Sequence, residues 1–251
     1  MTGPATTRDA FLGGRLTLQQ PATGYRAATD PVFLAAACPA RPGDTVLELG
    51  CGVGAAALCL HARVPGLRLT GVERQPAYAA LARANARDAG ADLTVVEADL
   101  ADLPADLRQH SFDHVLANPP YFAAGDGTAA ADPGREAANR EDTPLALWIA
   151  TARARLKPQG WLTLVHGADR LPDCLAGLRA GWGAVTVLPL QPRPGRPASR
   201  VLIRARKGAR APFRLLAPFL VHEFPAHPGD RPDYTAAADA VLRQAAALAF
   251  D

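Results

Sequence analysis

The sequence predicts an α/β fold: a doubly wound, mostly parallel sheet with helices on both of its faces. Over residues 45–166, short apolar runs alternate with longer amphipathic stretches, and several apolar runs end at a glycine or an acidic residue. This alternation is typical of parallel strands joined by crossover helices. The chain has 251 residues, of which 49% are hydrophobic, which is enough to bury a sizeable core. We expect one domain over residues 45–251, preceded by an N-terminal segment over residues 1–44.

The individual elements follow from apolar periodicity and from the positions of glycine and proline. Five strands are expected at residues 45–50, 67–73, 93–98, 112–117 and 160–166, and helices at residues 55–64, 76–88 and 144–156. Residues 122–140 are rich in glycine, alanine and aspartate, so we expect a flexible loop there. Two further strands, at residues 184–190 and 200–206, have no helix between them and should therefore pair antiparallel.

The composition excludes several classes of protein. No run of 18 apolar residues lacks a charge or a proline, so no membrane span is expected. Residues 1–14 lack the apolar core and cleavage site of an export signal. The four cysteines (Cys38, Cys51, Cys59 and Cys174) show neither CxxC spacing nor a pairing with histidine. We therefore expect no metal site and a location in the reducing cytoplasm.

The basic residues are unevenly distributed. The formal net charge is only +3, but no Asp or Glu occurs between Asp173 and Glu223. We call residues 174–222 the arginine-rich segment, because it contains eight arginines and one lysine. Guanidinium groups suit phosphate recognition, and clustered positive charge attracts polyanions. A solvated surface explains the same pattern equally well, so the charge alone leaves both interpretations open.

A glycine-rich loop follows the first strand of the domain and precedes a helix. It contains Gly50, Gly52 and Gly54, with Glu48 two residues before the first glycine. Glycines there permit a tight turn and let a ligand approach the backbone and the helix N-terminus. The dinucleotide-binding pattern needs GxGxxG, whereas the spacing here is GxGxG. An acid followed by this spacing is typical of an S-adenosylmethionine site, and an ordinary glycine-rich turn is the simpler alternative.

Two more acidic residues follow the next two strands. Glu73 ends the second strand and suits hydrogen bonding to two ribose hydroxyls, and Asp99, after the third, is placed to accept from an adenine amino group. Acids at the ends of three successive parallel strands meet at the carboxyl edge of the sheet, where open α/β sheets bind ligands. This coincidence favours a cofactor site over a plain turn.

The fourth strand runs directly into Asn118-Pro119-Pro120-Tyr121. Proline fixes φ and holds the preceding residue extended, so the tetrapeptide is stiff and offers no N–H at its two prolines. The Asn118 side-chain carbonyl and the Pro119 backbone carbonyl are then two acceptors for the hydrogens of a planar amino or amide nitrogen. Such positioning favours direct methyl transfer without a strong base. Tyr121 or Phe122 offers a face on which a planar base can stack.

These motifs resemble those of class I S-adenosylmethionine-dependent methyltransferases, and in particular the bacterial tRNA (adenine-N6)-methyltransferases that modify valine tRNA. The likeness covers most of the chain, through the segments at residues 24–34, 48–54, 118–122, 200–208, 213–223 and 233–239. It implies a seven-stranded sheet with the last strand reversed. It also implies that the N-terminal segment lies over the cofactor. The cofactor residues that it implies are Asp30, Gly50, Gly52, Glu73, Asp99 and Asn118.

The function predicted from these observations is methyl transfer to N6 of an adenine in tRNA. Arg193, Arg196 and Arg200 are candidates for phosphate contact. Alternatives are N5-methylation of a protein glutamine, as in a release factor, and guanine-N2 methylation of ribosomal RNA. The 47 residues before Glu48 do not indicate the helical domain usual in the glutamine enzymes. A silent cofactor-binding module has no need of Asn118 and Tyr121, and a nicotinamide oxidoreductase is disfavoured by the glycine spacing.

Overall fold

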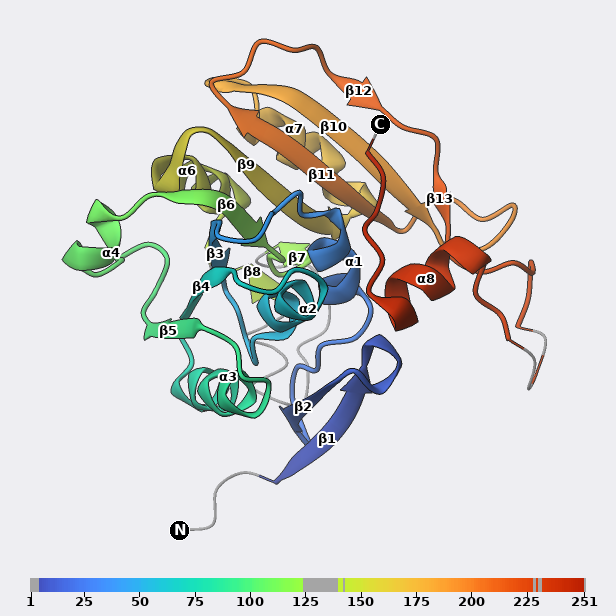
Figure 1. Ribbon diagram of the computed structural model, residues 1–251. Helices are drawn as coiled ribbons and strands as arrows, with labels where there is room; N and C mark the ends of the chain where they lie inside the picture. The colour runs from blue at the N-terminus through green and yellow to red at the C-terminus, as the bar shows by residue number, and fades with distance from the viewer. Residues whose placement is uncertain (1–4, 124–139, 142, 228, 230–231, 251) are drawn as a thin grey trace.

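Within the described residues the main sheet has nine strands, of which seven form its body and two short ones lie at its edge. The computed structural model describes residues 5–123, 140–141, 143–227, 229 and 232–250. In spatial order the seven strands are β5 (Leu93–Glu97), β4 (Arg68–Glu73), β3 (Thr45–Leu49), β6 (Phe112–Ala117), β9 (Leu156–Gly167), β11 (Arg200–Lys207) and β10 (Trp182–Gln191). Figure 1 shows this sheet crossing the whole molecule. The predicted α/β sheet is confirmed.

The direction of the strands also agrees with the prediction. Every pairing within the group β3, β4, β5, β6 and β9 is parallel. Strand β11, in contrast, pairs antiparallel with both β9 and β10. The last long strand in the chain is therefore the reversed one. Two short strands that were not predicted, β12 (Arg214–Leu215) and β13 (Phe219–Leu220), add to the outer edge of β10.

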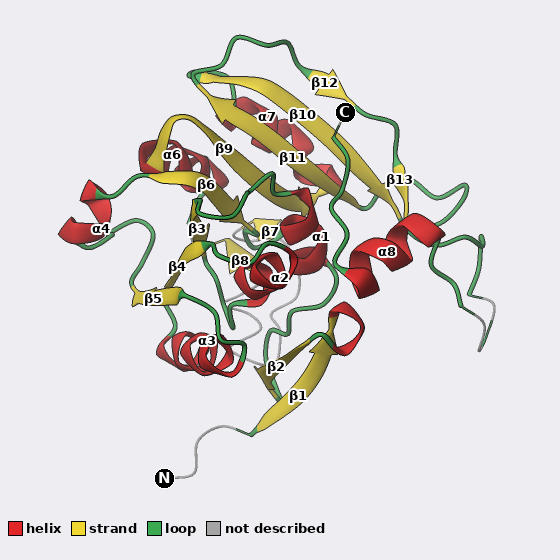
Figure 2. Cartoon of the chain, in the orientation of Figure 1, coloured by secondary structure: helices red, strands yellow, loops and turns green. Residues whose placement is uncertain are grey.

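Helices cover both faces of the sheet (Figure 2). Neighbouring residues of a strand point to opposite faces, and Val46 and Leu47 of β3 accordingly belong to two different core clusters. Helices α1 (Asp30–Ala37), α2 (Ala55–Arg63) and α8 (Ala236–Gln244) contribute to the first cluster, and α4 (Ala105–Gln109), α6 (Leu145–Arg155) and α7 (Leu171–Gly177) to the second. This arrangement makes the sheet doubly wound.

Helix α3 (Pro76–Asp88) runs beside the β5 edge, with proline in its first turn as predicted. Its residue Asn85 is fully buried and ties the helix to an N-terminal hairpin. The Asn85 side chain accepts from Gln19 N at 2.7 Å and donates to Gln19 O at 3.0 Å. The hairpin consists of β1 (Thr6–Phe11), the short 3-10 helix η1 (Leu12–Gly14) and β2 (Leu16–Pro21), and it was not predicted.

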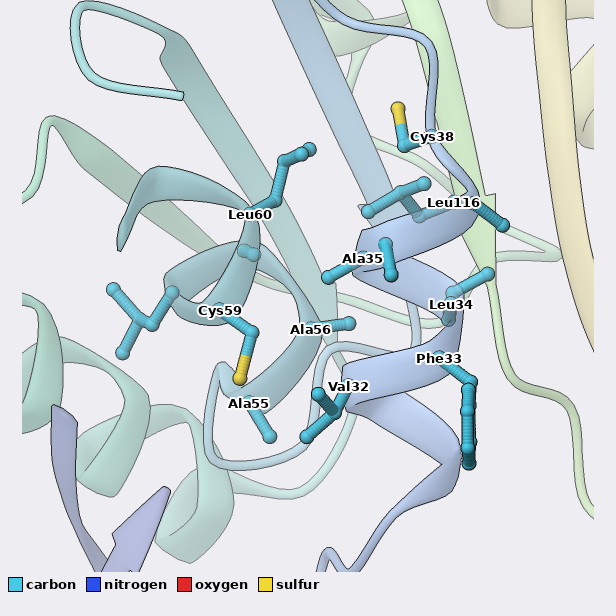
Figure 3. Packing of buried hydrophobic residues seen from close by; sticks show 14 of the residues in the cluster. Val32, Phe33, Leu34, Ala35, Cys38, Ala55, Ala56, Cys59, Leu60 and Leu116 are labelled. Carbon is cyan, nitrogen blue, oxygen red and sulfur yellow. The ribbon is translucent and has the colours of Figure 1, made fainter. Parts of the chain in front are cut away.

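Helix α1 belongs to the N-terminal segment but packs inside the core of the domain. All of its residues from Pro31 to Ala37 are buried. Figure 3 shows Val32 and Ala35 of α1 beside the alanines of α2. The segments on the two sides of residue 44 share one hydrophobic cluster. The expected division of the chain at this residue stays a prediction.

Most of the predicted loop at residues 122–140 lies outside the described residues. At its two ends, β7 (Phe122–Ala123) and β8 (Arg140–Glu141) pair in parallel. Among the described residues, no helix combines the length and the apolar character needed to cross a membrane.

The packing of α1 predicts that Leu34→Ala destabilises the whole domain. Leu34 is fully buried, and emptying such a site costs about 2–5 kcal/mol of unfolding free energy. Leu215→Ala is the matched control, because the Leu215 side chain in β12 is 62% exposed. Denaturant unfolding measures both variants. Equal, small losses in the two variants would contradict a core position for α1.

Candidate active site

The glycine loop turns sharply between β3 and α2. Gly50, Gly52 and Gly54 all have positive φ, at +64°, +54° and +84°. A Cβ at Gly50 would lie 2.6 Å from Cη2 of Trp148, so the close packing of α6 against the loop requires glycine there. At Gly52 a Cβ would meet nothing within 4 Å. The loop is thus closed on the α6 side and open at Gly52.

The open side of the loop faces a cavity at the carboxyl edge of the sheet. We call it the first cavity. It is lined by Gly50, Gly52, Glu48, Glu73, Asp99, Asn118, Pro119, Pro120, Tyr121, Tyr25, Tyr78, Trp148 and neighbouring residues. The sheet brings together residues that are far apart in the sequence, because the strands before them are paired in register.

Glu73 holds the loop from the adjacent strand. Its Oε2 accepts from Gly52 N at 2.9 Å and its Oε1 accepts from Gln75 N at 2.8 Å. Burial raises the pKa of this carboxyl, against the lowering effect of the two backbone hydrogen bonds. Asp99 also lines the cavity and accepts from Ala101 N at 2.8 Å through Oδ1.

Glu48 lies beneath the loop and is only 4% exposed. Its Oε2 accepts from Ala57 N at 2.8 Å, in the first turn of α2. Burial and, to a smaller extent, the charge of Glu73 together raise the pKa of Glu48 to about 8, against the lowering effect of the Ala57 hydrogen bond. Glu48 therefore holds a proton at neutral pH in the protein without ligands.

Tyr121 lies where the first cavity meets a second one, and Asn118 lines the first cavity beside it. The second cavity is lined by Gly24, Tyr25, Arg26, Ala28, Asp30, Pro31, Tyr121, Gly167, Asp169 and Arg200. The Tyr121 hydroxyl lies 2.8 Å from Asn118 Oδ1 and 2.7 Å from Asp30 Oδ2, and Asn118 Nδ2 lies 3.4 Å from the Tyr25 hydroxyl. Residues Tyr25, Pro31 and Tyr121 border both cavities.

One cationic group, the guanidinium of Arg200, and one aromatic ring, that of His166, pack against the Tyr121 ring. The guanidinium carbon of Arg200 lies 4.3 Å from the ring centroid, and the buried His166 ring meets it edge-on at 5.4 Å. His166 Nδ1 accepts from Gly167 N at 2.8 Å. Burial, together with the charges of nearby arginines, lowers the pKa of His166 to about 4, so the ring is neutral.

The structure places the remaining predicted residues as follows. Asp30 lines the second cavity rather than the first. Gly54 precedes α2 and packs under the loop against Leu58. Phe122 begins β7, but its side chain lies outside the described parts. Arg196 is exposed in the connection between β10 and β11.

Arg193 has an internal partner that the sequence did not predict. Its guanidinium forms a bidentate contact with Asp233, at 2.6 and 3.1 Å. This pair connects the β10–β11 connection to the segment before α8, so Arg193 has a structural role. Arg200 likewise lies against Asp30 and Tyr121, inside the site rather than on an outer surface.

Among the aromatic residues of the first cavity, Trp148 and Tyr25 were given no role by sequence reasoning. A buried core position is the simplest expectation for a tryptophan; Trp148 is buried, but it also lines the cavity. Its Nε1 makes no hydrogen bond within the described residues. Tyr25 was part of the segment that resembles the family, yet no role was assigned to it. Neither residue has a local pattern that marks a cavity wall.

Comparison with known proteins agrees with this geometry. Residues 46–131 match the family model of a methyltransferase domain. The chain is 34% identical over 174 residues to the tRNA1(Val) (adenine(37)-N6)-methyltransferase of Porphyromonas gingivalis, covering 66% of this chain and 68% of that protein. It is 35% identical over 175 residues to the release factor glutamine methyltransferase of Deinococcus radiodurans, covering 64% and 58%.

A solved structure shows the same fold over nearly the whole chain. The crystal structure of a predicted O-methyltransferase from Agrobacterium tumefaciens has a TM-score of 0.71 and 27% identity, covering 87% of this chain and 98% of that one. The overall fold of this chain is thus shared with a protein described as a predicted O-methyltransferase. The chain belongs to the S-adenosylmethionine-dependent methyltransferases. Within this class its sequence is similar to the tRNA1(Val) (adenine(37)-N6)-methyltransferases.

The first cavity fits S-adenosylmethionine. Gly52 leaves open space at the wall, and the unpartnered Nε1 of Trp148 is a buried donor beside it. The carboxylates of Glu73 and Asp99 are acceptors of the kind that ribose hydroxyls and an adenine amino group need. Among the described residues, no group of three histidine, cysteine or acidic side chains is arranged to hold a metal.

The burial of Glu48 predicts a pH-dependent gain in stability for Glu48→Gln. The folded-state pKa of about 8 lies above the ordinary 4.5, so the contribution of Glu48 to stability is fully present below pH 4.5 and is lost as the pH rises through 8. Glutamine keeps an acceptor for Ala57 N but never ionises. At pH 8 and without ligand, the free energy of unfolding of the variant should be about 4 kcal/mol higher than that of the wild type. Thermal unfolding at pH 4.5 and 8 tests this, and an equal difference at both pH values would contradict it.

Proposed function

We propose that this enzyme transfers the methyl group of S-adenosylmethionine to the exocyclic N6 of an adenine in tRNA. The observation that carries the proposal is that Tyr121 borders both cavities, while its hydroxyl lies 2.8 Å from Oδ1 of Asn118, which lines the first cavity. One cavity takes the cofactor, and the other is open to a planar substrate. The similarity to tRNA1(Val) (adenine(37)-N6)-methyltransferases supports adenine in tRNA as the target.

The cofactor would be held by the residues around the glycine loop. Glu73 accepts from the ribose hydroxyls, Asp99 accepts from the adenine amino group, and Gly50 and Gly52 allow close approach to the backbone. Glu48 and Gly54 act one step away, by fixing the loop to the start of α2. Bound there, the cofactor supplies a methyl group carried on a positively charged sulfur.

The chain's own contribution to the reaction is positioning. The carbonyl groups of Asn118 and Pro119 accept the two hydrogens of the amino group, which turns the nitrogen lone pair toward the methyl carbon. Methyl transfer would form a carbon–nitrogen bond as the carbon–sulfur bond breaks, and the methylated nitrogen would release one of its two hydrogens to water as a proton. Tyr121 or Phe122 stacks against the base, and Asp30 and Asn118 lie next to the boundary of the two cavities.

RNA binding is assigned to the part of the arginine-rich segment in and next to the β10–β11 connection. Arg196 is exposed, Arg200 borders the second cavity, and both lie in or next to the β10–β11 connection. Phosphate groups of a tRNA are proposed to contact these two arginines. Arg193, which pairs with Asp233, contributes by holding the connection in place, and it can meet phosphate only by exchanging that partner. A tRNA substrate fits the cytoplasmic location expected from the sequence.

A second candidate function is N5-methylation of a protein glutamine. The identity of 35% to a release factor glutamine methyltransferase favours it specifically, because a planar amide nitrogen also fits the two acceptors. Guanine-N2 methylation of ribosomal RNA uses the same acceptors. Incubation with labelled cofactor and separate pools of tRNA, ribosomal RNA and release factor distinguishes these functions. Nucleoside mass spectrometry should find N6-methyladenine in the tRNA pool, and label in another pool alone would overturn the proposal.

The acceptor role of Asn118 predicts a selective loss of activity. Asn118→Ala removes one of two acceptors for the amino group but leaves the loop and Glu73 in place. We expect cofactor affinity, measured by calorimetry, to stay within about threefold, while methyl transfer falls roughly a hundredfold. Turnover within threefold of the wild type would rule out the proposed role of this side chain.

The arginine-rich segment predicts that tRNA binding weakens steeply with salt, because phosphate contacts release counterions. Arg196→Ala should reduce the slope of log affinity against log salt by about one. Arg179→Ala is the matched control, since Arg179 is exposed before the start of β10, at the other end of that strand. Filter binding at a series of salt concentrations measures both slopes. A flat dependence for the wild type would remove this segment from the RNA interface.

A further inference from the structure

We infer that Asp30 is a positioning residue for methyl transfer: it accepts the hydroxyl proton of Tyr121 and thereby keeps the side-chain carbonyl of Asn118 free for the target nitrogen. The inference rests on the proposed function, because it concerns the same pair of acceptors. It assigns to Asp30 a task different from binding the cofactor.

A count of protons leads to this assignment. The Tyr121 hydroxyl lies 2.7 Å from Asp30 Oδ2 and 2.8 Å from Asn118 Oδ1. Both distances suit a hydrogen bond, but a hydroxyl has a single proton to donate. A carboxylate is a stronger acceptor than an amide oxygen, and hydrogen bonds to it are shorter. The proton is therefore held mainly by Asp30, and Asn118 Oδ1 is left in need of a donor.

The Tyr121 hydroxyl always has a proton to place. Burial raises the pKa of Tyr121 far above its ordinary value, and the charge of Asp30 raises it further. Without the Asp30 carboxylate, the acceptor that remains beside this hydroxyl is Asn118 Oδ1. The proton would then occupy the oxygen that the amino group of the substrate has to reach. Removal of Asp30 would thus make Tyr121 a competitor of the substrate.

The surrounding contacts hold this arrangement in place. Asp30 begins α1, whose other residues are all buried in the core. Arg200, the first residue of β11, lies 3.2 Å from the same carboxylate oxygen through Nε and packs on the Tyr121 ring. Its charge compensates that of Asp30 in a partly buried place. The acceptor, the hydroxyl and the balancing cation therefore come from three rigidly placed parts of the fold.

A double-substitution cycle tests the inference. Asp30→Ala, Tyr121→Phe and the double variant are compared with the wild type for kcat and for cofactor affinity. In the wild-type background Asp30→Ala should lower kcat roughly tenfold or more, with cofactor affinity within about threefold. Tyr121→Phe keeps the ring but has no hydroxyl proton, so in this background the same change at Asp30 should lower kcat by less than about threefold.

Asp173→Asn is the matched control for the removal of a carboxylate. Asp173 also pairs with an arginine, Arg170, but its side chain is 59% exposed on α7. We expect wild-type kcat for this variant. An equal loss of kcat from Asp30→Ala in both backgrounds would overturn the inference, since a purely structural role of Asp30 gives that result. A loss confined to cofactor affinity would overturn it too, and would make Asp30 a cofactor ligand.

The double-substitution cycle can fail or succeed independently of the proposed function, because it does not require a particular substrate. The cycle is measured with whichever amino or amide substrate the wild type methylates, because both kinds of nitrogen need the Asn118 carbonyl. Label in release factor alone would refute the tRNA proposal and still allow the cycle to be measured. A wild type that methylates none of the three pools would overturn both proposals.

Discussion

The parallel pairing of β3 with β4 and β6 is the constraint on which the rest of the site depends. In this register Leu49 is level with Val72 and with Ala117. The next residue of each strand or loop is then Gly50, Glu73 and Asn118, so backbone hydrogen bonds alone bring these three groups to one row. Going along the chain from β3, the next strands β4 and β5 are added on one side of it, and β6 and β9 are then added on the other side. The row therefore lies at the switch point of the sheet, where α/β proteins bind ligands.

The site places charge where water is largely excluded. Glu48 and Glu73 are both buried, and burial raises the pKa of each. In the protein without ligands Glu48 reduces stability at alkaline pH, whereas a positively charged cofactor bound nearby would favour the ionised forms of both acids. Stability and cofactor binding are therefore linked through the same two carboxyl groups. Their backbone hydrogen bonds, from Ala57, Gly52 and Gln75, limit the cost of burying them.

The second cavity depends on parts of the chain outside the region matched by the methyltransferase family model. The N-terminal segment supplies Tyr25 and Asp30, and β11 supplies Arg200. These residues surround Tyr121, which the sheet itself positions. This division suits an enzyme class in which a shared sheet binds the cofactor and added segments select the substrate. In this protein the added segments are integral to the core, as the buried position of α1 shows.

The sequence by itself determined the seven strands, their mostly parallel order and the glycine loop, because apolar periodicity, glycine spacing and proline act over a few residues. It also indicated that Glu73, Asp99 and Asn118 follow their strands at one edge. It did not reveal the N-terminal hairpin, whose strand β2 is tied to α3 through Gln19 and Asn85, or the cavity wall at Trp148. Only the tertiary structure decided the partners of the charged residues: Arg200 with Asp30, 170 positions apart, and Arg193 with Asp233, 40 positions apart. An arginine has the same local pattern whether it faces solvent, phosphate or a buried carboxylate, and the packing of distant segments selects among these.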